Sequence, residues 1–247
     1  MVSYIVGSEL IGSVQVTTNN QLARNLSAVN SAIELQALGA GRRASDITLC
    51  AVSKTFDANY IRPVINAGQR TFGENRVQEA EAKWSLLKRE YSDLELHLIG
   101  PLQTNKVSKA VALFDVIQTV DRPKLASAIS KEIAATKKLI SCYVQVNTGE
   151  ETQKAGVSPS EAPIFVKQCE NEFDLKIVGL MCIPPQNEEP TLHFAKLREI
   201  ALDLGLKGLS MGMSADYRAA INYGATIVRV GSAVFGPRMP IQATAAD

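Results

Sequence analysis

The chain has 247 residues, of which 46% are hydrophobic and 21% are charged, so it is long enough for one large α/β domain or two small ones. Its 26 basic and 25 acidic residues leave a formal net charge of +1, which excludes a strong overall field for nucleic acid or an anionic membrane. Apolar runs are short and interrupted, so no membrane-spanning helix is predicted. We therefore expect a small-molecule partner.

Residues 1–18 contain no lysine or arginine, which argues against the basic start of a secretory signal. We predict that these residues form a loosely ordered extension. The next segment, residues 19–39, has apolar residues at near-helical spacing and ends at a glycine-rich stretch. This pattern predicts an N-terminal helix.

From residue 47 onward, apolar or β-branched runs alternate with helical segments. The predicted strands are 47–53, 69–75, 94–100, 116–120, 140–147, 176–183, 207–212 and 226–235. The predicted helices are 58–68, 76–91, 104–114, 122–138, 159–173, 191–205 and 214–225. Eight strands in this alternation predict an α/β fold, a single (β/α)8 TIM barrel over residues 19–240 with a tail at 241–247. A doubly wound open sheet is the alternative, disfavoured because no G-x-G-x-x-G follows the first strand.

Three further expectations concern charged residues, thiols and histidines. The charges of KWSLLKRE (83–90) are interpreted as a solvated helix face, and Trp84 as a residue that packs this helix on the barrel. Four cysteines without paired spacing predict reduced core thiols in a cytoplasmic protein. The two histidines, His97 and His193, are far apart in the sequence, so we predict no metal site.

The loops after the carboxyl ends of barrel strands carry the chemistry in this fold. In this chain those positions hold polar residues, glycine and one proline: Lys54, Glu74, Asn75, Gly100, Gln103, Asp121, Asn147, Pro184, Ser210, Ser214, Arg229, Gly231 and Ser232. The segments SMGMS (210–214) and RVGSAVFG (229–236) follow the last two strands. Serine hydroxyls and exposed backbone N–H groups there favour a phosphate site, although serine and glycine also form turns and caps.

Lys54 directly follows the apolar run LCAVS, which permits two interpretations. Its ammonium reaches back to water at a strand end, or its amine attacks an aldehyde, a role that desolvation or a neighbouring positive charge would assist. Arg229, between two valines, needs a ligand ring nitrogen or phosphate, or an ion pair with Glu74 or Asp121. The Asn75 side chain is suited to a hydrogen bond with a ligand oxygen or with backbone groups of its own loop. Together these residues predict a pocket for a phosphorylated aldehyde.

Six ordered motifs carry a resemblance: AVSKTF, FGENRVQEA, HLIGPLQTNK, VNTGEETQKAG, GLMCIPP and LSMGMSADYRAAINYGATIVRVGSAVFG. Over roughly residues 20–240 the chain resembles the pyridoxal 5′-phosphate (PLP) homeostasis protein family, whose fold is similar to the N-terminal barrel of alanine racemase. The resemblance implies that Lys54 forms the internal aldimine with PLP, that Arg229 faces the pyridine nitrogen and that Asn75 lines the pocket. It implies phosphate ligands at Ser210, Ser214, Gly231 and Ser232, and no catalytic residue.

Three functions remain open from the sequence. The first is a monomeric protein that is not an enzyme and that carries or buffers PLP for vitamin B6 homeostasis, with apo PLP-dependent enzymes as recipients. The second is an amino-acid racemase, which needs a second base; in the resembling racemases a tyrosine from a C-terminal β domain supplies it. We expect no such domain here, and Tyr217 and Tyr223 fall in a predicted helix. The third is a Schiff-base lyase or aldolase that uses Lys54.

Overall fold

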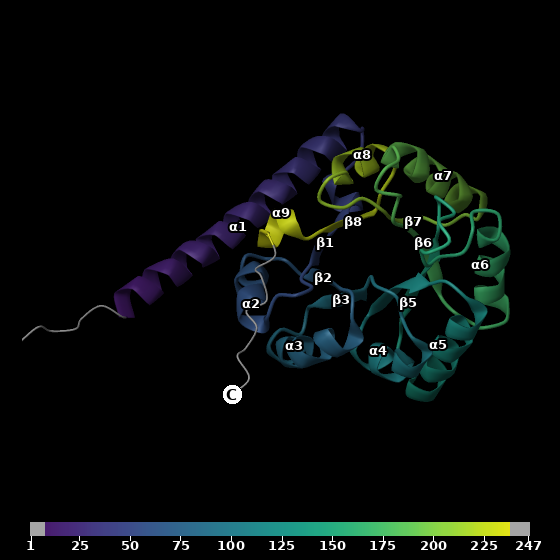
Figure 1. The fold of residues 1–247 in the computed structure, drawn as a ribbon, viewed down its shortest axis with the longest axis horizontal. Helices are drawn as coiled ribbons and strands as arrows, with labels where there is room; N and C mark the ends of the chain where they lie inside the picture. Colours follow the sequence, from purple (N-terminus) through teal and green to yellow (C-terminus); the bar gives the residue numbers. More distant parts are fainter. Residues whose placement is uncertain (1–7, 238–247) are drawn as a thin grey trace, which may run out of the picture.

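In a computed structural model of the chain, the backbone is described for residues 8–237 and the side chains for residues 19–237. Eight parallel strands pair in sequence order and close into a barrel, with helices around it (Figure 1). The strands are β1 Thr48–Val52, β2 Thr71–Glu74, β3 Glu95–Leu98, β4 Val116–Val120, β5 Ser141–Val146, β6 Ile177–Cys182, β7 Gly208–Ser210 and β8 Ile227–Val230. The predicted TIM barrel is confirmed, and the open-sheet alternative is wrong.

Helices alternate with the strands as the sequence pattern predicts. They are α1 Ser8–Gly39, α2 Ala58–Asn66, α3 Val77–Glu90, α4 Val107–Leu113, α5 Pro123–Thr136, α6 Ala162–Asn171, α7 Pro190–Asp203, α8 Tyr217–Asn222 and α9 Ser232–Phe235, with 3-10 turns η1 Ala44–Asp46 and η2 Thr104–Lys106. Local signals start several of them: Asp57 Oδ1 accepts from the Tyr60 N–H at 2.9 Å, and prolines open α5 and α7.

The last predicted strand, residues 226–235, was too long. Strand β8 ends at Val230, and the apolar residues that follow Gly231 form the short helix α9. Val234 and Phe235 are buried on that helix, which packs on α1 and places the Phe235 ring against Phe56, so their apolar character does not reflect a continued strand. This turn brings the chain back over the carboxyl-terminal end of the barrel.

Helix α1 begins at Ser8, earlier than the predicted start at residue 19, and contacts α2, α8 and α9 (Figure 1). Asn25 on α1 donates to the Val234 carbonyl at 3.1 Å, which ties α1 to α9. The division into residues 1–18, 19–240 and 241–247 stays a prediction, and residues 1–7 and 238–247 lie outside the described residues. Within the described residues, none of the helices combines the length and the apolar character that crossing a membrane requires.

The barrel has two buried layers. The larger one lies between the strands and the surrounding helices. The smaller one fills the barrel interior with Cys50, Val116, Tyr143, Met181 and Ile227. Cys50 on β1 is in register with Arg229 on β8, so their side chains point to the same interior. The interior therefore contains charged and polar groups beside apolar ones.

Candidate functional site

A cavity of about 350 Å³ lies at the carboxyl-terminal end of the barrel. Its walls come from the strand ends and the loops after them: Val52, Lys54, Phe56, Asn75, Ile99, Ile183, Met213, Ser214, Ala215, Arg229, Gly231, Ser232 and Gly236. The cavity brings together every site residue predicted from the sequence except Ser210. It forms where the fold concentrates chemistry, because parallel strands all end at this face.

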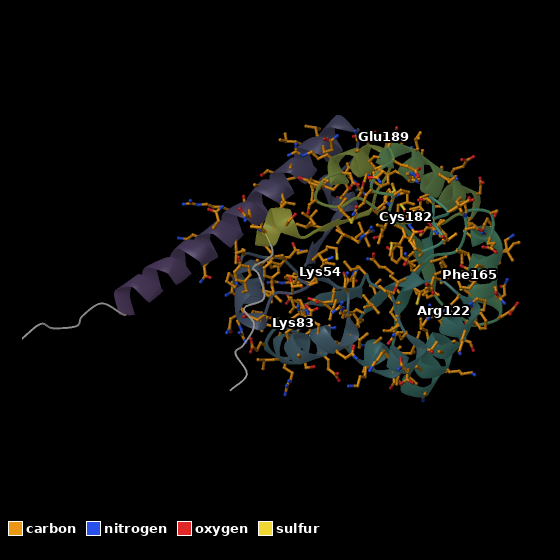
Figure 2. All side chains as sticks on the ribbon, viewed as in Figure 1. Lys54, Lys83, Arg122, Phe165, Cys182 and Glu189 are labelled. Atoms are coloured by element: carbon orange, nitrogen blue, oxygen red, sulfur yellow. The ribbon has the colours of Figure 1, made fainter. Side chains whose placement is uncertain are left out.

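Lys54 lies half-buried, two residues after the end of β1 and inside the ring of helices (Figure 2). The backbone on both sides of it is held by one buried side chain. Lys83 Nζ donates to the Ser53 carbonyl at 2.8 Å and to the Phe56 carbonyl at 2.9 Å. Thr55, with φ of 71°, has the left-handed conformation that turns the chain here. Lys83 therefore fixes the loop that carries Lys54.

Lys83 is part of a buried ion pair. Its Nζ lies 3.0 Å from Glu74 Oε1, the oxygen that also accepts from Ser53 Oγ at 2.6 Å and from Trp84 Nε1 at 3.0 Å. Burial raises the pKa of the Glu74 carboxyl, and the neighbouring Lys83 ammonium opposes that rise. The interpretation of Lys83 as part of a solvated face is wrong. The sequence contained a signal for the burial of Lys83, because this residue lies on the same side of the helix as the apolar Ala80.

Arg229 is buried in the floor of the cavity, with only 3% of its surface exposed. Its Nη1 donates to Ser210 Oγ and its Nη2 to the Cys182 carbonyl, both at 2.7 Å. The alternative ion pairs are wrong, because Glu74 pairs with Lys83 and Asp121 pairs with Arg122. Burial lowers the pKa of the Arg229 guanidinium, which nevertheless keeps its charge at neutral pH.

The partners of Arg229 in the described part of the chain are neutral oxygens, so its positive charge is not cancelled by a carboxylate in direct contact. A buried guanidinium with no carboxylate in direct contact favours an anionic group or a hydrogen-bond acceptor in the cavity above it. This donor and charge set fits the phosphorylated aldehyde that the sequence predicts.

Ser210, the last residue of β7, is fully buried and does not line the cavity. Its hydroxyl donates to Gln118 Oε1 at 2.6 Å and accepts from Arg229. The expectation that this side chain binds phosphate therefore does not fit its position. The side chain points to the barrel interior because the strand alternates direction at each residue, and from there it orients Arg229.

Two glycine-containing loops form one wall of the cavity. Ser214 Oγ accepts from the Gly231 N–H at 3.3 Å, so the loops after β7 and β8 meet there. Asp216 Oδ1 accepts from the Met213 N–H at 2.6 Å and shapes the first loop. Gly212 has φ of 90°, and a Cβ at this position would lie 2.6 Å from the Ala220 Cβ. Only glycine allows α8 to pack this closely under the loop.

Sequence reasoning missed the apolar walls. Phe56 lines the cavity, and its ring stacks on Tyr60 at 4.9 Å and on Phe235 at 5.1 Å between centroids. Its place directly after the SKT segment was the available signal. Met213 and Ala215 also line the cavity on either side of Ser214. The Phe56 ring, Met213 and Ala215 give the cavity apolar wall surface, which is typical of sites that hold a small organic ligand.

The fold and this site define a class of protein. Residues 25–239 match the family described as alanine racemase, N-terminal domain. The chain is 42% identical over 224 residues to the pyridoxal phosphate homeostasis protein of Pseudomonas aeruginosa, covering 88% of this chain and 96% of that protein. With the Escherichia coli K12 protein of the same name it shares 38% identity over 228 residues, 89% of this chain and 97% of that one. The chain belongs to the pyridoxal phosphate homeostasis protein family.

Solved structures agree with this assignment. PipY of Synechococcus elongatus, in a structure with PLP bound, is 35% identical, with a TM-score of 0.77 over 87% of this chain and 100% of that one. Alanine racemase of Clostridium difficile is 15% identical, with a TM-score of 0.69 over 90% of this chain and 58% of that chain. The second likeness shows the shared barrel fold alone.

Proposed function

We propose that this protein binds PLP in the cavity at the carboxyl-terminal end of the barrel and carries or buffers it for vitamin B6 homeostasis. The observation that carries the proposal is the convergence of Lys54, Arg229 and Ser214 on one cavity of about 350 Å³. A primary amine, a buried cation and a hydroxyl match the aldehyde, the ring nitrogen and the phosphate of PLP. The family membership and the PLP-bound PipY relative support the same ligand.

In this proposal Lys54 holds the ligand covalently. Its Nζ attacks the aldehyde carbon, a C=N bond replaces the C=O bond, and the oxygen leaves as water. The clamp formed by Lys83 keeps the flanking backbone in place, so the amine reaches the same point in the cavity each time. Phe56 and Ile183 add apolar surface to the cavity wall.

The remaining residues orient the ligand. Arg229 cannot give up a proton at neutral pH, so it donates to the ring nitrogen and keeps that nitrogen unprotonated. Ser214, Ser232 and the Gly231 backbone form the phosphate end, and Asn75 lines another wall. Ser210 has no direct contact with the ligand in this arrangement.

A carrier fits the cavity better than a racemase. Among its described lining residues there is no tyrosine, histidine, cysteine, aspartate or glutamate that would act as a second base. Tyr217 is buried in α8, and neither it nor Tyr223 lines the cavity. We propose accordingly that the protein is not an enzyme.

We also propose that the protein is a monomer in the cytoplasm and that it passes PLP to apo PLP-dependent enzymes. The near-neutral net charge and the free, buried cysteines support this part of the proposal.

The test is the visible absorption spectrum of the purified protein supplied with PLP, before and after borohydride reduction and peptide mapping. We expect a Schiff-base band in the wild type that is absent from Lys54→Ala, with the reduced label on Lys54. Lys131→Ala, which changes an exposed lysine on α5, is the matched control and should keep the band. A colourless wild type that takes up no PLP contradicts the proposal and favours the lyase or aldolase.

Robust turnover of alanine or another amino acid by the isolated protein would instead favour the racemase. That assay uses the same protein samples and follows the loss of optical activity. We expect no turnover above the rate of free PLP, because Lys54 is the only base among the described residues that line the cavity.

A further inference from the structure

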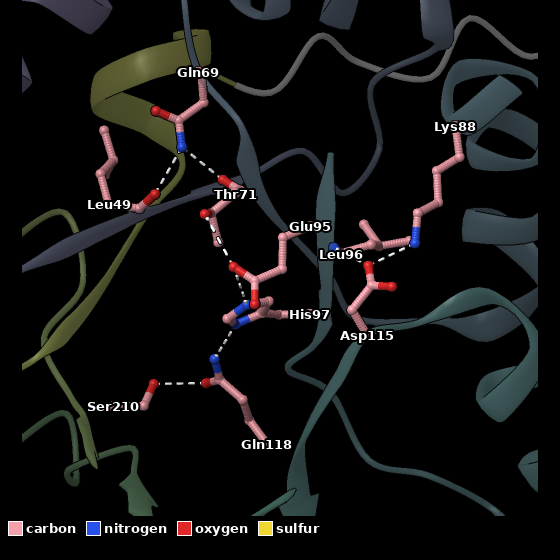
Figure 3. Close-up of polar contacts among 10 residues, drawn as sticks. All are labelled: Leu49, Gln69, Thr71, Lys88, Glu95, Leu96, His97, Asp115, Gln118 and Ser210. Atoms are coloured by element: carbon pink, nitrogen blue, oxygen red, sulfur yellow. Dashed lines mark hydrogen bonds and ion pairs between the residues drawn. The ribbon is translucent and has the colours of Figure 1, made fainter. Parts of the chain in front are cut away.

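A chain of polar side chains runs through the barrel interior, and most of it is drawn in Figure 3. Arg229 Nη1 donates to Ser210 Oγ at 2.7 Å, and Ser210 Oγ donates to Gln118 Oε1 at 2.6 Å. Gln118 Nε2 lies 2.7 Å from His97 Nδ1, and His97 Nε2 lies 3.5 Å from Glu95 Oε2. The contacts join strands β8, β7, β4 and β3 across the interior.

This series of polar side chains connects the two ends of the barrel. Arg229 lines the cavity at the carboxyl-terminal end. Glu95 and His97 line a second cavity, of about 280 Å³, whose other walls come mainly from the starts of the strands. Gln118 and Ser210 between them are fully buried, and 2% of His97 is exposed. An unmade hydrogen bond at any of these buried positions is costly, so each group depends on its neighbour.

With the Gln118 amide in the orientation of the structure, the hydrogen bonds run in one direction. The Gln118 amide nitrogen has only protons to donate, so His97 Nδ1 must accept and carries no proton. The other ring nitrogen, Nε2, is buried without a hydrogen-bond partner among the described residues and lies 3.5 Å from Glu95 Oε2. The Gln118 carbonyl accepts the Ser210 proton, which leaves a Ser210 lone pair for Arg229. Rotation of the Gln118 amide by half a turn would reverse the contact with His97, whose Nδ1 would then have to carry the proton.

We infer that Gln118 is a positioning residue for the proposed PLP site: through Ser210 it fixes the direction of the Arg229 guanidinium, and its amide N–H donates to His97 Nδ1. The part concerning PLP rests on the proposed function. Gln118 touches neither cavity, so its effect on the ligand passes through Ser210 and Arg229. Glutamine suits this position because one side chain supplies both a donor and an acceptor, whereas glutamate lacks the donor and leucine lacks both.

The first experiment needs no PLP. Nitrogen-15 NMR of the histidine rings in the full chain at about pH 7 reports which ring nitrogen carries the proton. We expect a bare Nδ1 in wild-type His97 and a proton on Nδ1 in Gln118→Glu, because a carboxylate accepts a hydrogen bond from Nδ1–H. A proton on Nδ1 in the wild type, or no change in Gln118→Glu, overturns the inference for His97.

The second experiment measures Arg229 and the ligand together. We expect Gln118→Leu and Ser210→Ala each to shift the Arg229 guanidinium signals in the unliganded protein and to weaken PLP binding about tenfold. Ser210→Ala should leave the His97 tautomer unchanged. The double variant should bind PLP no more weakly than the single variants, because both changes interrupt the same series of hydrogen bonds. Gln145→Leu is the matched control, because it changes a buried glutamine on β5 that is not part of this series of hydrogen bonds.

Two outcomes separate this inference from the proposed function. Wild-type Arg229 signals and wild-type PLP affinity in a folded Gln118→Leu variant overturn the positioning role. If the wild type itself binds no PLP, the proposed function fails, and the Arg229 and His97 signals of the unliganded variants still decide the role of Gln118. Should Gln118→Leu fail to fold, Ser210→Ala and Gln118→Glu provide the same comparison.

Discussion

Lys83 Nζ lies 3.0 Å from Glu74 Oε1, and this buried ion pair stands directly beside the loop that carries Lys54. The same ammonium donates to the carbonyls of Ser53 and Phe56 on either side of Lys54. One lysine therefore serves as a structural clamp for another, whose side chain lines the cavity. The stability of this pair and the position of Lys54 are coupled.

Replacement of Lys83 by methionine should lower the free energy of unfolding by about 3 kcal/mol, because it leaves Glu74 buried without its cation. Urea denaturation measures the change. Lys88→Met on the same helix is the matched control: Lys88 pairs with Asp115 in a partly exposed ion pair, so we expect a loss of about 1 kcal/mol or less. Equal losses in the two variants would contradict the structural role of Lys83.

The Lys83→Met variant should also become less stable as the pH rises. Burial raises the pKa of the Glu74 carboxyl above its unfolded value, and removal of Lys83 takes away the charge that opposes this rise. The folded state then binds the proton more tightly than the unfolded state, so stability falls from about pH 4.3 upward until the folded pKa is passed. Unfolding free energies across this range measure the slope. Adding Glu74→Gln should abolish this pH dependence of the unfolding free energy. A slope that persists would mean that another group causes the pH dependence.

Gly212→Ala should be more damaging than Gly205→Ala. Both glycines have positive φ, 90° and 67°, but the added methyl at Gly212 meets the Ala220 Cβ at 2.6 Å, whereas the space at Gly205 is open. We expect a loss of about 1 kcal/mol at Gly205 from backbone strain alone, and clearly more at Gly212. Thermal unfolding gives both values. Because Gly212 precedes the lining residues Met213 and Ser214, its variant should also bind PLP more weakly; equal effects at the two glycines would rule out the predicted clash.

The native protein should resist thiol reagents. Its four cysteines are buried free thiols, and burial raises the pKa of Cys50, Cys142, Cys169 and Cys182 to about 12 in each case. The reactive thiolate is therefore scarce and shielded at about pH 8. We expect no rapid labelling in the folded protein and labelling of all four thiols in denaturant, followed by absorbance. Fast modification of one thiol in the native state would reveal local opening around it.

The sequence pattern predicted the strands and most of the helices to within a few residues. Alternating apolar runs, proline starts and glycine stops act over a few neighbouring residues, so their effect can be read locally. The strand after residue 226 was overextended because an apolar run alone does not distinguish a strand from a short buried helix. The rim residues Lys54 and Arg229 were found because the fold class itself tells which strand ends meet.

By itself, the sequence determined the barrel, the face that holds the cavity and most of the residues on that face, since these follow from local periodicity and the order of elements. Tertiary structure alone decided which polar groups meet inside. Ser210 turned inward to Gln118, 92 positions away in the chain, and Lys83 was buried by the loop that follows β1. Such partners depend on the register of distant strands and on which helix face the barrel covers, and neither is encoded within one segment.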